Sequence, residues 1–279
     1  MRTALLLALA AALATLAGCG SQQVSEKVEV EKVQVEKVAA ENPNVQYVDT
    51  DTGRWRIHDT NRPAPPVITP DEPGGPWKNE IVLFNGKDLA GWTDSKGDPS
   101  KWVVRDGYME SVKGSGPVRT AQEFGSCQLH VEFATPSNVQ GSSQGRGNSG
   151  VFLQGEYEIQ VLDSYDNFTY PDGQCGALYG RAVPLVNACL RPGEWQSYDI
   201  IFHRPIFKDG KVDRKARFTV LQNGILIQDN VELEGGTQWR GPHKISDYDT
   251  SHPDKGPIML QDHGNPVRFR NIWIRELPD

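Results

Sequence analysis

The sequence predicts an all-β protein, a two-sheet antiparallel jelly-roll sandwich with an extended N-terminal tether. Three observations carry this prediction. The 279 residues include 28 glycines and 19 prolines, and both residue types interrupt helices. From Ile81 onward, apolar residues recur at every second position, as in a strand with one buried face. No segment offers more than about two turns of helical periodicity, which argues against a helical bundle.

Composition sets the size of the core and excludes some classes of protein. Hydrophobic residues make up 37% of the chain and aromatic residues 9%, which suffices for the core of one domain of about 200 residues. The chain is therefore not globally disordered. Its formal net charge is −7, and it contains no basic block. Because nucleic-acid binding depends on cationic contacts to phosphates, we expect no nucleic-acid partner.

Residues 1–18 have the layout of a secretory signal peptide. Arg2 precedes an apolar run, residues 4–16, that is shorter than the roughly 20 residues of a membrane-spanning helix. The run ends in Leu16-Ala17-Gly18-Cys19, which resembles the lipobox of bacterial lipoproteins. This resemblance implies lipidation of Cys19 and an exported protein anchored in a membrane. Lipoproteins held at the inner membrane often carry Asp directly after this cysteine. The resemblance therefore implies that a chain with Gly20 at that position is anchored in the outer membrane, facing the periplasm or the cell surface. The alternative is an ordinary cleaved leader.

Two segments separate this leader from the folded domain. Residues 19–45 form a charged tether, in which Glu-Lys-Val recurs every five residues, a spacing that fits neither a helix nor a coiled coil. An oligomerising coil is the alternative. Residues 46–79 are rich in proline and are expected to be extended, with Trp55 and Trp77 packing along the domain surface. The jelly-roll domain is expected to span residues 80–279.

The strands of this domain follow from alternation and from turn residues. Apolar and polar side chains alternate from Cys127 to Ala134 and from Ser197 to His203. Two further runs, residues 217–221 and 225–228, flank Asn223-Gly224, the strongest short-range signal for a β-hairpin. Residues 257–261 and 267–275 are expected to form the two closing strands.

Residues 151–161 are predicted to form one strand with a core face and a polar face. The core face carries Val151, Leu153, Tyr157, Ile159 and Val161. The polar face carries Phe152, Gln154, Glu156, Glu158 and Gln160. Such a row is often only the solvent side of a sheet, and that alternative stays open. However, two amides, an aromatic ring and a further acid, Asp163, form a mixture that suits sugar hydroxyls.

The spacing of Glu158, Gln160 and Asp163 resembles the bulged acidic strand of laminarinase-like glycoside hydrolases, Glu-x-Asp-x-x-Glu. The match departs at two of the three acids. A bulge after Gln160 would return Asp163 to the face of Glu158. The two Cα atoms would still lie about 13 Å apart, whereas a retaining glycosidase holds its carboxyl groups about 5 to 5.5 Å apart. A conventional two-carboxylate glycosidase is therefore an alternative that we do not prefer.

A second group of candidate site residues ends the strand at 257–261. Gln261 and His263 share a side, and a histidine beside an acid can transfer protons near neutral pH. The alternative is a structural histidine that donates to a backbone carbonyl. The other histidines are scattered and show no metal-ligand spacing.

The remaining motifs predict less. Cys175 and Cys189 lie in loop-like segments and can pair in an oxidising compartment, whereas Cys127 opens a strand on its apolar face and is expected to be buried. Gly145-x-Gly147-x-x-Gly150 matches the letters of a dinucleotide fingerprint. It precedes a strand and lacks the βαβ context, so we expect no nucleotide ligand.

Five motifs, in order along the chain, resemble the 3-keto-disaccharide hydrolase family, long called domain of unknown function 1080. The motifs are Leu83-Phe84-Asn85-Gly86-Lys87-Asp88-Leu89-x-Gly91-Trp92, Asn148-Ser149-Gly150-Val151-Phe152-Leu153, Tyr157-Glu158-Ile159-Gln160-Val161-Leu162-Asp163-Ser164, Gly193-Glu194-Trp195, and Leu260-Gln261-Asp262-His263-Gly264 through Phe269-Arg270-Asn271-Ile272-Trp273. The resemblance covers residues 81–277. It implies a concanavalin A-like jelly roll, an exported or lipid-anchored protein, and cleavage of glycosides oxidised at C3.

The implied chemistry needs no pair of glycosidase acids. A ketone at C3 acidifies the hydrogen at C2, so one base can start an elimination that expels the glycosidic oxygen from C1, and water can add afterwards. We expect Glu158 and His263 to be the acid and base. The expected ligands of the sugar or of a divalent metal ion, whose presence stays open, are Asn148, Gln160, Asp163, Tyr179 and Gln261. A non-catalytic, lectin-like carbohydrate-binding module is the main alternative function.

Overall fold

The computed structural model describes residues 45–50, 52–65 and 80–279. The chain divides into two compact units, residues 1–65 and residues 66–279. In the first unit, β1 (Tyr47–Thr50) and β2 (Gly53–Arg56) form an antiparallel hairpin. The sequence predicted an extended stretch here and missed this reversal. The signal peptide, Cys19 and all but the last residue of the tether lie outside the described residues, as do residues 66–79.

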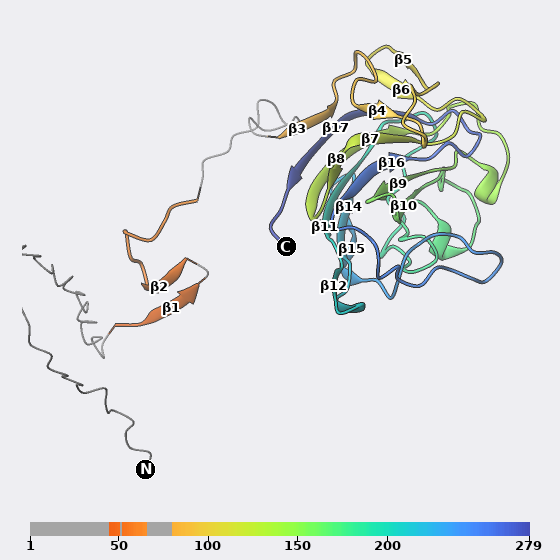
Figure 1. Cartoon of the computed structure of the whole chain (residues 1–279). Coiled ribbons are helices and arrows are strands. Elements are labelled where there is room, and N and C mark those ends of the chain that lie inside the picture. Colours follow the sequence, from red (N-terminus) through yellow and green to blue (C-terminus); the bar gives the residue numbers. More distant parts are fainter. Residues whose placement is uncertain (1–44, 51, 66–79) are drawn as a thin grey trace, which may run out of the picture. The chain divides into compact units, whose positions relative to one another are not determined.

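The second unit consists of two antiparallel sheets that face each other (Figure 1). The larger sheet has eight strands in the order β15-β14-β11-β8-β17-β6-β5, with β3 also paired to β17. These strands are β3 (Ile81–Phe84), β5 (Val103–Arg105), β6 (Tyr108–Glu110), β8 (Cys127–Ala134), β11 (Gln196–His203), β14 (Arg217–Gln222), β15 (Ile225–Glu232) and β17 (Arg268–Glu276).

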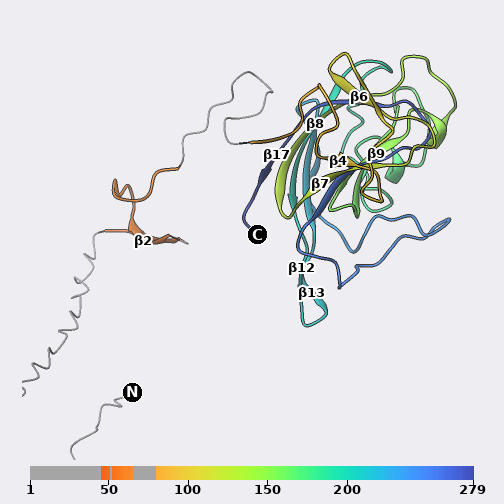
Figure 2. The ribbon, with the colours of Figure 1, turned by 45° about the horizontal axis from the view of Figure 1, so that its top comes forward.

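The smaller sheet has five strands in the order β10-β9-β16-β7-β4. These strands are β4 (Trp92–Thr93), β7 (Val118–Phe124), β9 (Ser149–Leu153), β10 (Tyr157–Val161) and β16 (Gly256–Leu260). A separate two-stranded ribbon, β12 (Ile206–Lys208) with β13 (Lys211–Arg214), extends from the end of the larger sheet (Figure 2).

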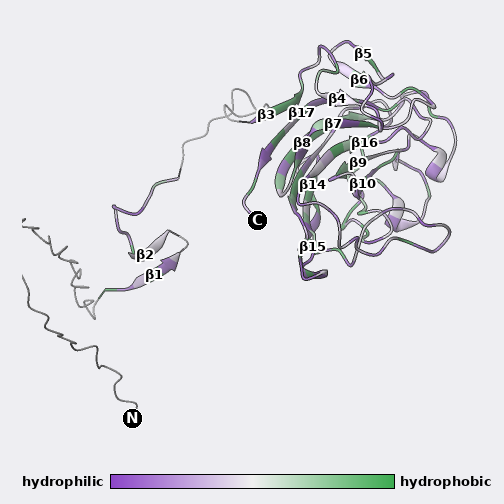
Figure 3. Cartoon of the chain, viewed as in Figure 1, coloured by the Kyte–Doolittle hydropathy of each residue, from purple (hydrophilic) through white to green (hydrophobic). Residues whose placement is uncertain are grey.

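The hydrophobic core fills the space between the two sheets. The apolar side chains that the sequence placed on one face of β8 and of β11 are fully buried, and hydrophobic residues concentrate on the strands in Figure 3. Tyr157 of the smaller sheet contacts Phe202 and Phe218 of the larger one, with ring centroids 5.7 and 6.3 Å apart. The predicted sandwich is therefore confirmed.

The predicted turn at Asn223-Gly224 is also confirmed, as is the near absence of helix over the described residues. β14 and β15 join at Asn223-Gly224, whose φ angles of 55° and 76° are those that such a tight hairpin requires. In the described part of the chain, the only helical segments are two 3₁₀ turns, Ser143–Gly145 and Pro171–Gly173. Over these same residues, no helix has the length and apolar character needed to cross a membrane.

The predicted single strand at 151–161 is wrong, because the chain reverses in its middle. Gln154 and Gly155 both have positive φ, 55° and 67°, and they turn β9 back onto β10. The hairpin pairs Phe152 with Glu158 and Gly150 with Gln160. Residues paired across a hairpin share a face, so the predicted division into a core face and a polar face survives for both strands. Gln154 and Glu156, however, belong to the turn and leave the polar row.

Candidate active site

A cavity of about 430 Å³, here called the Glu158 cavity, opens where β9, β10 and the end of β16 meet two loops. It is lined by Gln144, Asn148, Phe152, Glu158, Gln160, Tyr179, Gln238, Trp239, Gln261 and His263. The structure therefore brings together six of the seven residues that the sequence predicted for the site. Asp163 is the residue that does not line this cavity.

Glu158 is the one carboxylate among these lining residues. Its side chain extends from β10 across the face of the sheet and lies over Gly150 of β9. A Cβ added to Gly150 would come within 2.3 Å of the Glu158 Oε1 atom and 2.8 Å of the Phe152 Cε2 atom. Only 6% of Glu158 is exposed, and this burial raises its pKa to about 8. The carboxyl group can therefore exchange a proton near neutral pH.

The outer edge of β10 is covered by two loop segments that position further site residues. The Tyr179 amide donates to the Glu158 carbonyl at 3.2 Å, and Leu178 forms a β-bridge with Ile159. The Glu158 amide donates to Thr237 Oγ1 at 2.7 Å. These contacts protect an edge strand and bring both loops to the cavity.

Tyr179 carries its hydroxyl at the wall of the cavity, 2.9 Å from the hydroxyl of Tyr170. Burial, reinforced by the hydrogen bond to Tyr170, raises the pKa of Tyr179 above its usual value. The phenol therefore stays protonated at neutral pH and can donate a hydrogen bond to a ligand oxygen.

A network of amides forms another wall. Gln160 Nε2 donates to Gln144 Oε1 at 2.9 Å, and Asn148 Nδ2 donates to the Gln144 carbonyl at 2.7 Å. The Oε1 atoms of Gln160 and Gln261 are buried and have no hydrogen-bond partner in the described structure. Buried acceptors without partners are rare in folded proteins. These two oxygens are suited to accept hydrogen bonds from the hydroxyls of a sugar.

His263 lies at the exposed mouth of the cavity, two residues after Gln261. The turn that holds it is fixed by Asp262, whose carboxylate accepts from the Gly264 amide at 2.8 Å and the Gly116 amide at 3.1 Å. The Gln261 amide donates to the Gly150 carbonyl at 3.0 Å, which ties this end of the chain to β9. His263 is therefore positioned by its neighbours and remains accessible to water.

Asp163 lies behind the cavity wall in an ion pair. Its Oδ2 atom accepts from Arg146 Nε at 2.7 Å, and Arg146 also donates to the Tyr165 carbonyl at 2.8 Å. β10 ends at Val161 in a regular register with β9, so no bulge returns Asp163 to the face of Glu158. The carboxylate pair of a laminarinase-like site is therefore not assembled.

Four lining residues were not assigned to the site from the sequence: Gln144, Phe152, Gln238 and Trp239. Phe152 was placed on the correct face, as the aromatic ring of a row suited to sugar hydroxyls, but was not assigned to the site. Gln144 lies in the 3₁₀ turn Ser143–Gly145 before β9, where no periodicity marks it. Trp239 is 65% exposed. An isolated tryptophan in a segment rich in glycine and proline is the one signal that could have identified its loop, because exposed loops often carry binding residues.

The Trp239 loop, residues 237–246, is anchored at its two ends. Arg181 Nε donates to the Gly236 carbonyl at 2.9 Å, and Arg181 Nη2 donates to the Ser246 carbonyl. On the opposite side, Gln238 Nε2 donates to a carboxylate oxygen of Glu156 in the β9–β10 turn. These contacts hold the loop against the edge of the smaller sheet.

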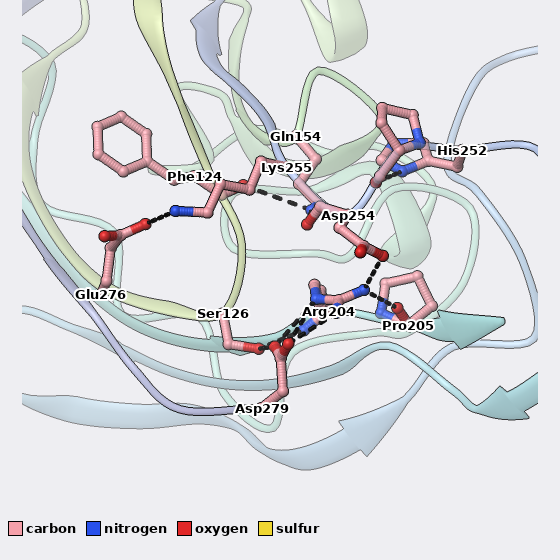
Figure 4. Close-up of polar contacts among 11 residues, drawn as sticks. Phe124, Ser126, Gln154, Arg204, Pro205, His252, Asp254, Lys255, Glu276 and Asp279 are labelled. Carbon is pink, nitrogen blue, oxygen red and sulfur yellow. Dashed lines mark hydrogen bonds and ion pairs between the residues drawn. The ribbon is translucent and has the colours of Figure 1, made fainter.

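Figure 4 shows how the chain is held just before β16, where it returns from this loop. Asp254 accepts from Arg204 Nη1 at 2.6 Å through its side chain, and from Gln154 Nε2 at 2.9 Å through its carbonyl. Arg204 also binds the carboxylate of Asp279 at 2.7 Å. The β9–β10 turn, the C-terminal residue and the start of β16 are thereby joined.

The structure also places the candidate metal ligands and cysteines. Among the residues described, no three His, Cys, Asp or Glu side chains gather to form a metal site. Cys127, Cys175 and Cys189 are free thiols, and Cys127 is buried as predicted. The predicted option of a Cys175–Cys189 disulfide is not realised, although the two thiols are hydrogen-bonded neighbours. The Cys175 sulfur also lies 3.1 Å from the Tyr198 hydroxyl.

Comparison with known families decides the identity of this domain. Residues 79–275 match the model of the 3-keto-alpha-glucoside-1,2-lyase-like domain. The chain belongs to this family. Membership in the 3-keto-alpha-glucoside-1,2-lyase-like family confirms the resemblance found in the sequence motifs and supports a glycoside-cleaving enzyme.

Relatives of the family agree with this assignment. A protein of Bacteroides thetaiotaomicron named 3-keto-disaccharide hydrolase is 26% identical over 242 residues, which cover 71% of this chain and 78% of that protein. A crystal structure from Parabacteroides distasonis, provisionally named a glycosyl hydrolase, is 45% identical with a TM-score of 0.72. It covers 79% of this chain and 95% of its own. A second protein of that species, 23% identical with a TM-score of 0.50, shares the fold over 71% of this chain and 94% of its own.

Proposed function

We propose that this protein cleaves the glycosidic bond of 3-keto-glycosides, including 3-keto-disaccharides, by removing the proton at C2. The observation that carries the proposal is the Glu158 cavity itself. It contains a single buried carboxyl group whose pKa is raised to about 8, and it is surrounded by amides and a phenol. This set suits an elimination that needs one strong base, and it lacks the second carboxylate of a conventional glycosidase.

The proposed reaction has two stages. A base takes the hydrogen from C2, and the electrons of the C–H bond form an enolate with the C3 carbonyl. The enolate re-forms the carbonyl, creates a C1=C2 double bond and expels the glycosidic oxygen, which takes up a proton. Water then adds across this bond, with hydroxyl at C1 and hydrogen at C2, so the net reaction is hydrolysis. Groups that donate hydrogen bonds to the enolate oxygen stabilise the intermediate.

We assign the base to Glu158 and the proton donor for the leaving oxygen to His263. A carboxylate with a raised pKa is a stronger base than an ordinary one, and Glu158 packs beside Phe152, where a C–H bond can approach it. His263 is exposed at the mouth and can regain its proton from water. The free oxygens of Gln160 and Gln261 accept from hydroxyls, and Tyr179 donates to a sugar oxygen.

The test is incubation of the protein with 3-keto-trehalose or 3-keto-lactose in D2O. We expect released monosaccharide, with deuterium at C2 of the 3-keto product. The variant Glu158→Gln should cleave the substrate about 100-fold or more slowly than wild type, because a proton-transfer group usually contributes a factor of this size to the rate. Cleavage by Glu158→Gln or His263→Ala at the wild-type rate would refute the assignment. Binding without turnover would favour a lectin-like module, and Glu158-dependent cleavage of unoxidised β-glucan would favour a conventional glycosidase.

The proposed location is a membrane surface outside the cytoplasm, with the chain anchored by lipid on Cys19. The motif Leu16-Ala17-Gly18-Cys19 supports this part of the proposal. In bacterial cells, we expect the protein to be labelled by a radioactive fatty acid. Loss of that label in Cys19→Ser, with export retained, would support the anchor, whereas unchanged labelling would exclude it.

A further inference from the structure

A second cavity adjoins the Glu158 cavity and shares part of its wall. It measures about 510 Å³ and is here called the Lys244 cavity. Tyr179 and Trp239 line both cavities, whereas Tyr170, Asp172, His243 and Lys244 line only the second one. The proposed chemistry in the Glu158 cavity uses neither Lys244 nor Asp172.

The shared wall is an exposed aromatic side chain held by a folded loop. Trp239 forms a β-bridge with Ile245, and the Lys244 amide donates to the Gly241 carbonyl at 3.1 Å, so the loop is a narrow hairpin. Ile245 packs on Gly180, where an added Cβ would lie 2.4 Å from the Ile245 Cδ1 atom. With the hydrogen bonds that Arg181 donates and the one that Glu156 accepts, these contacts fix the base of the loop before any ligand arrives. A preorganised aromatic surface lowers the entropic cost of binding.

Pyranose rings present apolar C–H faces and polar hydroxyl edges, and the Lys244 cavity offers partners for both. Its aromatic lining comes from Tyr170, Tyr179 and Trp239. Asp172 can accept hydrogen bonds from hydroxyls, and Lys244 can donate to them. Cavities that combine apolar walls with a few polar groups are typical binding sites for small molecules.

We propose that the Lys244 cavity is the subsite for the leaving sugar, and that Trp239 is the wall that both sugars of a disaccharide contact. The inference rests on the proposed function, in which the oxidised sugar occupies the Glu158 cavity. The glycosidic oxygen then lies between the two cavities, near Tyr179 and Trp239. The protein therefore selects 3-keto-disaccharides over 3-keto-glycosides whose leaving group is a small alcohol.

The first experiment compares two substrates, 3-keto-trehalose and methyl 3-keto-α-glucoside, which differ in the leaving group. Lys244→Ala should lower kcat/KM for the disaccharide about fivefold. Its kcat/KM for the methyl glycoside should stay within about twofold of the wild-type value. Trp239→Ala should lower kcat/KM for the disaccharide about tenfold or more, and should lower kcat/KM for the methyl glycoside by a smaller factor. Phe168→Ala is the matched aromatic control, since Phe168 is 95% exposed and lines neither cavity. Equal losses on both substrates in both variants would overturn the subsite.

The second experiment measures binding of glucose, the sugar released from 3-keto-trehalose, by ligand-observed NMR. We expect wild type and Phe168→Ala to bind glucose, and Lys244→Ala and Trp239→Ala to bind it at least about fivefold more weakly. If wild type cleaves neither keto substrate yet binds glucose through Trp239 and Lys244, the proposed reaction fails and the sugar subsite stands. If binding is equal in all four proteins, the subsite is refuted whatever the activity.

Discussion

Glu158 shows how burial of a single side chain prepares a carboxyl group for proton transfer. It is 6% exposed on β10, and the loss of hydration disfavours its charged form. Its pKa of about 8 places ionisation near the pH at which a cell operates. If Glu158 is the base, it acts in its deprotonated form, so measured kcat/KM should rise as pH approaches about 8.

The same shift predicts a pH-dependent gain in stability for Glu158→Gln. The folded pKa is raised above the unfolded value, so the stability present at low pH is lost as pH rises from about 4.5 to about 8. Glutamine at this position does not ionise, so the Glu158→Gln variant does not lose this stability as pH rises. The variant should therefore exceed wild type in Tm by more at pH 8 than at pH 5, with a free-energy difference of roughly 1 to 4 kcal/mol.

Differential scanning calorimetry at the two pH values checks this prediction. Glu123→Gln, which removes an exposed carboxyl group on β7, should show no comparable change with pH. A Tm difference for Glu158→Gln that stays constant between pH 5 and pH 8 would contradict the buried, protonated state of Glu158.

Gly150 is the second residue that the site requires. Its added Cβ would displace the Glu158 carboxyl group or the Phe152 ring. We expect Gly150→Ala to lower kcat/KM about 100-fold, since a catalytic group misplaced by about 1 Å can lose that much. Overpacking should also cost about 1 to 3 kcal/mol of stability. Gly145→Ala is the matched control, because its Cβ would meet nothing within 4 Å. Full activity in Gly150→Ala would show that the carboxyl position is not critical.

At the scale of elements, the site depends on the loops that flank β9 and β10. Gln144 and Asn148 lie in the segment that leads into β9, and Asp163 follows β10. The Arg146–Asp163 pair joins these two segments. Asp163 is 1% exposed, so its removal leaves the Arg146 charge without this partner in a largely buried position.

Asp163→Ala therefore tests whether Asp163 is structural or catalytic. Breaking a buried ion pair by removing one partner costs about 3 to 5 kcal/mol, so we expect a large fall in the free energy of unfolding by urea denaturation. At temperatures where the variant stays folded, KM should rise more than kcat falls. The double variant Asp163→Ala/Arg146→Ala should lose less stability than the two single losses combined. A 100-fold loss of kcat without destabilisation would instead make Asp163 a catalytic carboxylate.

At the scale of the whole molecule, two curved sheets provide the framework for one loop-lined site. The hydrophobic core is formed by residues between Ile81 and Ile274, all within the second compact unit. The β1–β2 hairpin belongs to the other unit. A domain with its own core is expected to fold independently.

A chain of residues 66–279 should therefore keep both fold and activity. We expect its Tm to match that of residues 20–279 within about 2 °C, and its kcat/KM for a 3-keto-disaccharide to match within about twofold. Thermal denaturation and product assays on both soluble chains measure these values. Loss of cooperative unfolding in the shorter chain would show that the first 65 residues contribute to the core.

The sequence alone determined the features that depend on local periodicity and on turn chemistry. Alternation predicted the buried faces of β8 and β11, and Asn223-Gly224 predicted the β14–β15 turn, because each signal lies within a few adjacent residues. The same alternation placed Glu158 and Gln160 on the polar face. It could not reveal the reversal at Gln154-Gly155, since a hairpin keeps the same division of faces as a straight strand.

Only the tertiary structure decided which distant residues complete the site. The Trp239 loop reaches the cavity through contacts of Thr237 and Gln238 with the β9–β10 hairpin, far away along the chain. Asp163 has the spacing of a catalytic acid, yet Arg146 holds it behind the cavity wall. Strand periodicity records which side of a sheet a residue faces. It does not record which loop or cation meets that residue in space, because those contacts depend on how separate segments pack.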